Sequence, residues 1–172
     1  MTEQWRQHHP KGSYVRTKEE LFKVDRKNTE HVLGLFSWDH LPYDDELKHQ
    51  DNLPSLVNMT SVALDLLLEQ SQDHGFFLMV EGGRIDHANH YALATRALSE
   101  TVAMDRAVEE ILRRVSLEET LIIVTADHSH TLSVSGQLIF EGKSPLNILY
   151  QHFIYFKNMV NGIIVTIAGG YR

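Results

Sequence analysis

Cysteine is absent from the sequence, which excludes a disulfide framework and any zinc site built on thiolates. No apolar run approaches the length of a membrane span, and residues 1–16 are polar, so no secretory signal peptide is expected there. Basic residues are fewer than acidic residues. The sequence has 16 Lys and Arg and 23 Asp and Glu, which gives a formal net charge of -7. This balance argues against nonspecific binding to nucleic acid or anionic membrane and favours a bound cation.

The apolar residues predict one compact α/β unit. With 172 residues, 42% of them hydrophobic, the chain is long enough for a single domain with a core. Short apolar runs predict strands at residues 32–36, 76–80 and 121–124. Between them, one helix is expected to begin at Pro54, and a longer one is expected over residues 93–115. This order predicts a parallel sheet with flanking crossover helices.

The first of these helices carries apolar residues at helical spacing and should end near Gly75. The residues that define this expected stripe are Leu56, Met59, Thr60, Ala63, Leu66 and Leu67.

Polar clusters follow two of the expected strands. The segment "EGGRIDHANH" follows residues 76–80, and "TADHSH" follows residues 121–124. Because the carboxyl ends of parallel strands meet at one edge of a sheet, we expect the two clusters to lie close together there. Asp86 and His90 are four residues apart, so they share a face if a helix begins near Asp86. The adjacent Asp127 and His128 suit a loop.

These clusters hold the donor types of a metal site. Histidine nitrogens and carboxylate oxygens suit zinc, whereas Glu81, a hard oxygen donor, better suits magnesium. Two zinc ions held about 4 Å apart can clamp the attacking and leaving oxygens of a displacement at phosphorus. The alternative is structural, because Asp and His are common in turns and caps at strand ends. Two clusters on neighbouring strands favour the metal site.

The segments "FFLMVEGGRIDHANH" and "TLIIVTADHSH", with "VLGLF" and "LPSL" upstream, resemble the animal alkaline phosphatases. The resemblance covers about residues 5–136. It implies a phosphomonoesterase with two zinc ions and one magnesium ion at the carboxyl edge of a parallel sheet. Carried over by the resemblance, the zinc and magnesium ligands would be Asp86 and His90 for the first zinc, Asp127 and His128 for the second, and Glu81 for magnesium.

The resemblance also implies supporting residues and marks departures. His130 would orient the aspartate of the first zinc, and His87 would lie near the magnesium. The family's nucleophilic serine belongs to an Asp-Ser-Ala segment that this sequence lacks. Ser37 and Leu53 replace a glutamate and an aspartate of the family's calcium site, which argues against calcium here.

We therefore expect a C-terminal-half fragment or truncated isoform of an animal alkaline phosphatase. Residues 1–136 would form the family part and residues 137–172 a divergent tail, without phosphatase activity in isolation and with poor solubility. The resemblance implies a phosphomonoester substrate, a homodimer and a lipid-anchored extracellular location, with signal peptide and anchor signal absent from this chain. Two alternatives remain open: an inactive metal-binding module or decoy isoform that pairs with a full-length subunit, and a gene-model fragment without an independent role.

Overall fold

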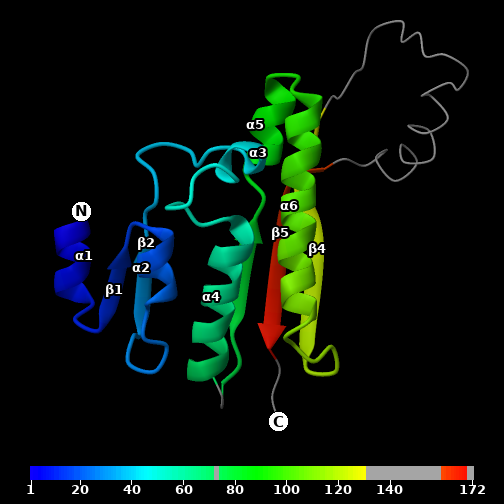
Figure 1. The fold of residues 1–172 in the computed structure, drawn as a ribbon. Helices are drawn as coiled ribbons and strands as arrows, with labels where there is room; N and C mark the ends of the chain where they lie inside the picture. Colours follow the sequence, from blue (N-terminus) through cyan, green and yellow to red (C-terminus); the bar gives the residue numbers. More distant parts are fainter. Residues whose placement is uncertain (72–73, 131–159, 170–172) are drawn as a thin grey trace, which may run out of the picture.

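The computed structural model describes residues 1–71, 74–130 and 160–169, which form a mixed α/β structure (Figure 1). Among these residues, no helix is long and apolar enough to cross a membrane. The helices are α1 (Thr2–His8), α2 (Lys18–Phe22), α3 (Asp44–Leu47), α4 (Leu56–Gln70), α5 (Arg84–His90) and α6 (Ala94–Leu112).

The described strands form two separate sheets. One is a small parallel pair, and the other has three strands in the order β3-β5-β4. The small parallel sheet and the mixed helix and strand content fit an α/β fold, but the prediction of one sheet through residues 32–36, 76–80 and 121–124 is wrong. Apolar periodicity locates strands, whereas their partners depend on segments far away in the sequence. The strands are β1 (Gly12–Val15), β2 (His31–Gly34), β3 (Phe77–Glu81), β4 (Thr120–Ser129) and β5 (Val160–Gly169).

Strands β3 and β4 run in the same direction, because each pairs antiparallel with β5 between them. Glu81 and Thr125 are both register partners of Ile164, so the two strands reach the same level of the sheet. The carboxyl ends therefore meet at one edge, as expected. Strand β4 continues past this level, which places Asp127 and His128 within the strand and not in the predicted loop.

Helix α4 begins later than predicted. Pro54 precedes the N-cap residue Ser55 instead of lying in the first turn. The Ser55 Oγ accepts a hydrogen bond of 3.2 Å from the backbone N–H of Asn58, and Asn58 Oδ1 accepts one of 3.1 Å from the backbone N–H of Ser55. This capping box satisfies two backbone donors that a helix start leaves without partners.

Helix α4 buries side chains on two sides. Leu64 belongs to a core that includes Ile85 and Met104, whereas Val62 belongs to a second core that includes Val15. The predicted apolar stripe missed both Val62 and Leu64, although both are fully buried. A helix that lies between two cores has no single apolar face, so a one-stripe interpretation is wrong for it.

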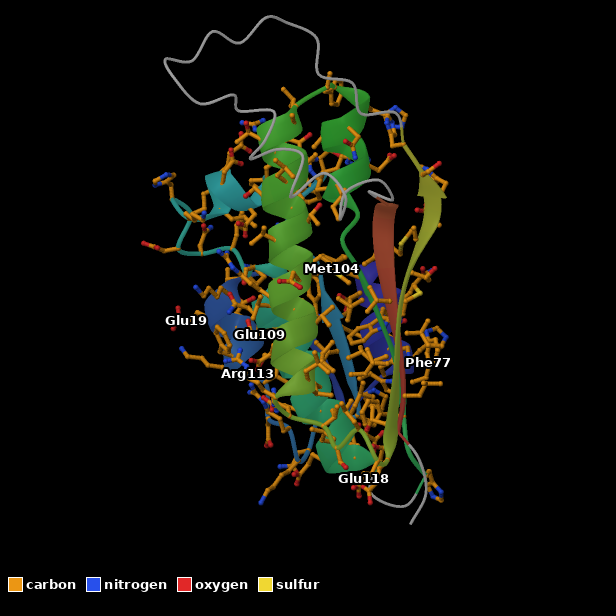
Figure 2. All side chains as sticks on the ribbon, turned by 90° about the vertical axis from the view of Figure 1, so that its right-hand side faces the viewer. Glu19, Phe77, Met104, Glu109, Arg113 and Glu118 are labelled. Carbon is orange, nitrogen blue, oxygen red and sulfur yellow. The ribbon has the colours of Figure 1, made fainter. Side chains whose placement is uncertain are left out.

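Helix α6 covers one face of the three-stranded sheet together with α4 (Figure 1). Figure 2 shows Met104 on the side of α6 that faces the sheet and Glu109 and Arg113 on its outer side. Phe77 lies on the opposite face of the sheet, where it is 63% exposed. The helices thus leave one sheet face uncovered among the described residues.

Candidate metal centre

Two glycines, Gly82 and Gly83, connect β3 to α5. Gly82 is buried, and a Cβ there would lie 3.1 Å from Ile85 Cδ1 and 3.4 Å from Met104 Cβ. Both neighbours are fully buried, so a side chain at Gly82 would force atoms packed between α5 and α6 to shift by a few tenths of an ångström. Gly83 is the N-cap residue of α5. This turn sets the position of the helix that carries the candidate ligands.

Asp86 lies between the polar cluster on α5, to which it belongs, and the polar cluster on β4. Its Oδ2 lies 3.3 Å from His90 Nε2 on the same face of α5, as the four-residue spacing predicted. Its Oδ1 lies 3.9 Å from His128 Nε2 on β4. His128 Nε2 also lies 3.4 Å from Asp127 Oδ2. The structure therefore brings four of the five expected ligands together.

Exposure differs between these side chains. The Asp86 side chain is 25% exposed, whereas the His90 side chain is 62% exposed. The carboxylate is thus held by the fold while the imidazole rings remain open to solvent. An ion could reach this group from solution without rearrangement of the core.

His130 lies as close to Asp86 and His90 as a ligand would. One potential ligand atom from each of the three residues lies within 4.8 Å of the other two. The His90 and His130 rings are 4.6 Å apart between centroids and nearly perpendicular, at 86°. Ligands of tetrahedral zinc are about 3.4 Å apart, which small side-chain rotations would reach from here. Sequence reasoning gave His130 only a supporting role.

The pattern "HSH" contains a signal that could have identified this position. In an extended segment, residues two apart point to the same side. His128 and His130 therefore both face the Asp86 end of α5 once β4 is extended to Ser129.

The pKa of His128 is raised above its ordinary value. The main cause is the hydrogen bond of 3.0 Å between its ring Nδ1 and the Ser129 carbonyl, which favours the protonated ring. Desolvation opposes this effect, and the carboxylates of Asp127 and Asp86 add to it. A proton and a metal ion would therefore compete for this ring.

His87 lies apart from this group. Its ring is 4.3 Å from that of His40 between centroids, and its Nδ1 is buried without a hydrogen-bond partner among the described residues. Burial lowers the pKa of His87, and the positive charges of His40 and Arg84 lower it further. Arg84 lies over the ring of Tyr43, with its Cζ 3.9 Å from the centroid. The pairing with His40 was not predicted from the sequence.

Glu81 is exposed at the end of β3. Its carboxylate lies beside the start of α5, since a Cβ at Gly83 would come within 3.4 Å of Glu81 Oε1. Within the described part of the chain, the group of potential ligand atoms that lie within 4.8 Å of one another consists of Asp86, His90 and His130 and does not include Glu81. The structure thus places Glu81 near the helix start and does not bring it into the group around Asp86.

Comparison with known proteins gives a consistent result. The family model described as "Alkaline phosphatase" matches residues 1–157. The chain is 42% identical over 126 residues to an alkaline phosphatase of Gadus morhua, covering 73% of this chain and 26% of that protein. It is 42% identical over 123 residues to a membrane-bound alkaline phosphatase of Bombyx mori, covering 72% and 22% of the two chains.

A human protein gives a similar match. Over 141 residues the chain is 38% identical to the tissue-nonspecific isozyme of alkaline phosphatase from Homo sapiens, covering 79% of this chain and 26% of that protein. The chain thus spans about a quarter of the length of these curated relatives.

Proposed function

The chain belongs to the alkaline phosphatase family, and we propose that it supplies metal ligands of a phosphomonoester hydrolase. The observation that carries this proposal is the position of Asp86, whose two carboxylate oxygens face His90 on α5 and His128 on β4.

Two zinc ions and one magnesium ion are the cofactors that we propose. Asp86 and His90 would hold the first zinc, with His130 as a further nitrogen donor within reach. Asp127 and His128 would hold the second zinc, and Glu81 would bind magnesium. The donor set around Asp86 fits zinc, because it combines imidazole nitrogens with a carboxylate and contains no thiolate.

Bound zinc would neutralise charge on phosphate oxygens and lower the pKa of a coordinated water molecule. The residues of the chain contribute orientation to this chemistry. Asp86 is held by contacts from two elements, so its two oxygens point in different directions toward the two clusters. Arg84 packs over Tyr43, and we therefore assign it no role in binding phosphate. His87 would lie near the magnesium ion, with its ring beside that of His40.

We further propose that this chain alone does not hydrolyse phosphomonoesters. The sequence contains no Asp-Ser-Ala segment that could supply the family's nucleophile. Residues that act as one catalytic unit lose most of their effect when one member is missing. Full-length members that include this segment would act on phosphomonoesters at the membrane surface, in line with the description of the Bombyx mori relative as membrane-bound.

Zinc titration of the whole chain tests the proposal. Wild-type protein should bind zinc saturably in competition with a chromogenic chelator, and Asp86→Asn should weaken this binding at least tenfold. The matched control is Asp105→Asn, which changes an exposed carboxylate on α6. Equal zinc affinity of the wild type and Asp86→Asn would contradict the proposed site. Release of p-nitrophenol from its phosphate ester should not exceed the rate with free zinc.

An inactive module that pairs with a full-length subunit is the second candidate function. It is favoured by the uncovered sheet face, where Phe77 is 63%, Met79 56% and Leu121 61% exposed. Apolar patches of this kind often mark interaction sites. Co-purification of the chain with a full-length alkaline phosphatase subunit, lost in Phe77→Lys, would support this role. Failure to co-purify would exclude this pairing.

A further inference from the structure

The central strand of the larger sheet comes from outside the family match. The family match ends at residue 157, whereas β5 covers residues 160–169. Strand β5 pairs with every residue of β3 and with every residue of β4 except Asp127. A segment without a counterpart in the family match therefore holds the two ligand-bearing strands together.

The geometry of β3 and β4 defines a slot that fits one strand. Neighbouring strands lie about 4.8 Å apart, so two strands on either side of a third are about 9.6 Å apart. At this distance β3 and β4 cannot hydrogen-bond to each other, and each would leave an edge without partners. An inserted strand completes both ladders at once. Strand β5 does so antiparallel to both neighbours, which is the more stable pairing.

Residues 160–169 lie in the slot between β3 and β4, and we propose that this slot is a strand-acceptor site for an uncharged, β-branched segment whose insertion from the same chain fixes the positions of the two strand ends. The segment reads "VNGIIVTIAG" and contains no charged residue, which suits a central strand with neighbours on both sides. Occupation from the same chain is favoured, because loop closure becomes only slowly more costly with length and tethering raises the effective concentration.

The occupied slot sets the spacing of the candidate ligands, a consequence that rests on the proposed function. Glu81 and Thr125 share the register partner Ile164, so β5 determines how far apart the ends of β3 and β4 lie. The chain continues from β3 into α5 with Asp86, and β4 carries His128. The distance of 3.9 Å between Asp86 Oδ1 and His128 Nε2 therefore depends on the strand between them.

Cysteine cross-linking tests the slot independently of zinc. The chain has no cysteine, so only introduced thiols can react. Thr166 is the register partner of both Met79 and Ile123. Under mild oxidation, the double variants Met79→Cys/Thr166→Cys and Ile123→Cys/Thr166→Cys should each form a disulfide within one chain. Ile122→Cys/Thr166→Cys is the control, because Ile122 faces the other side of β4 and should not react.

Intact mass and nonreducing electrophoresis distinguish the outcomes. A cross-link within one chain for both register pairs supports the proposal. Failure of both pairs, a reaction as efficient in the control, or disulfides that join two chains would each overturn occupation by the same chain. None of these results depends on metal binding, so they separate the strand-acceptor site from the proposed zinc ligands.

A proline pair tests the coupling to the ligands. Ile164→Pro removes a backbone N–H opposite Glu81 and Thr125, whereas Val160→Pro alters only the pairing with Ser129. Hydrogen exchange of the backbone amides of β3 and β4 should become at least about tenfold faster in Ile164→Pro than in Val160→Pro. Zinc affinity should also fall more in Ile164→Pro than in Val160→Pro. Unchanged exchange in both strands would overturn the proposal, whereas faster exchange with unchanged zinc affinity would overturn only the coupling.

Discussion

Asp86 Oδ1 and His128 Nε2 lie 3.9 Å apart, although α5 and β4 are separated in the sequence by the whole of α6. Each residue also contacts a neighbour on its own element, His90 for Asp86 and Asp127 for His128. This relationship joins two short polar segments into one group of potential ligands. The contact arises because β3 and β4 run in the same direction and end on the same side of the sheet.

His130 should matter to zinc binding as much as His90. Both rings place a nitrogen within 4.8 Å of the donor atoms of Asp86 and of each other. We expect His130→Ala and His90→Ala to weaken zinc binding by similar factors, on the order of tenfold or more. His74→Ala, at an exposed position after α4, is the control and should have no effect. A loss confined to His90→Ala would return His130 to a supporting role.

Gly82→Ala should destabilise the chain, whereas Gly83→Ala should be tolerated. The added methyl group at Gly82 meets Ile85 and Met104, which are fully buried and must shift to make room for it. We expect a loss of about 1–3 kcal/mol in the free energy of unfolding. At Gly83 the nearest atom is the mobile carboxylate of Glu81, so the change should stay within about 0.5 kcal/mol. Urea unfolding of both variants measures the difference, and equal losses would contradict it.

Ser55→Ala should remove the cap of α4. The variant loses the hydroxyl that accepts the hydrogen bond from the Asn58 N–H, at a cost of about 1 kcal/mol in the free energy of unfolding. Ser55→Gly should cost only a few tenths of that, because glycine is a good N-cap residue. A Ser55→Ala midpoint equal to that of the wild type in thermal unfolding would show that the capping box is not formed in solution.

Glu100 should make the chain less stable as pH rises. Burial raises the pKa of Glu100 above its ordinary value of 4.5; a hydrogen bond from the Asp44 N–H and the charge of Arg84 oppose this effect, and the charges of Asp44 and Asp45 reinforce it. The folded state therefore holds the proton more tightly than the unfolded state. Stability is lost as pH rises from about 4.5 through the raised pKa, and the loss is complete above it.

Glu100→Gln should remove this dependence. The amide keeps an oxygen that accepts the hydrogen bond from the Asp44 N–H but carries no charge to desolvate. Relative to the wild type, the variant should gain stability between acidic and neutral pH, measured by denaturant unfolding at a series of pH values. Glu109→Gln, on the outer side of α6 in Figure 2, is the control and should follow the wild-type profile. Parallel profiles for Glu100→Gln and the wild type would refute the assignment.

Local sequence patterns determined the elements and the chemistry of the candidate ligands. Apolar runs located β3 and the first part of β4, and helical spacing located α4 and α6 within a few residues. The four-residue spacing placed Asp86 and His90 on one helical face, and the residue types already indicated nitrogen and oxygen donors. The motifs also indicated the family, which the match over residues 1–157 shows. These features depend on neighbouring residues, whose geometry is set by backbone periodicity.

Only the tertiary structure decided which elements meet. Val62 and Leu64 are both buried because α4 lies between two cores, and His87 meets His40 because α5 packs beside the loop before α3. The insertion of β5 between β3 and β4 could not be read from either strand, since the segment that pairs with an open strand edge can come from a distant part of the sequence. Such contacts join residues far apart in the sequence, and their free energy comes from burial and pairing that no local pattern encodes.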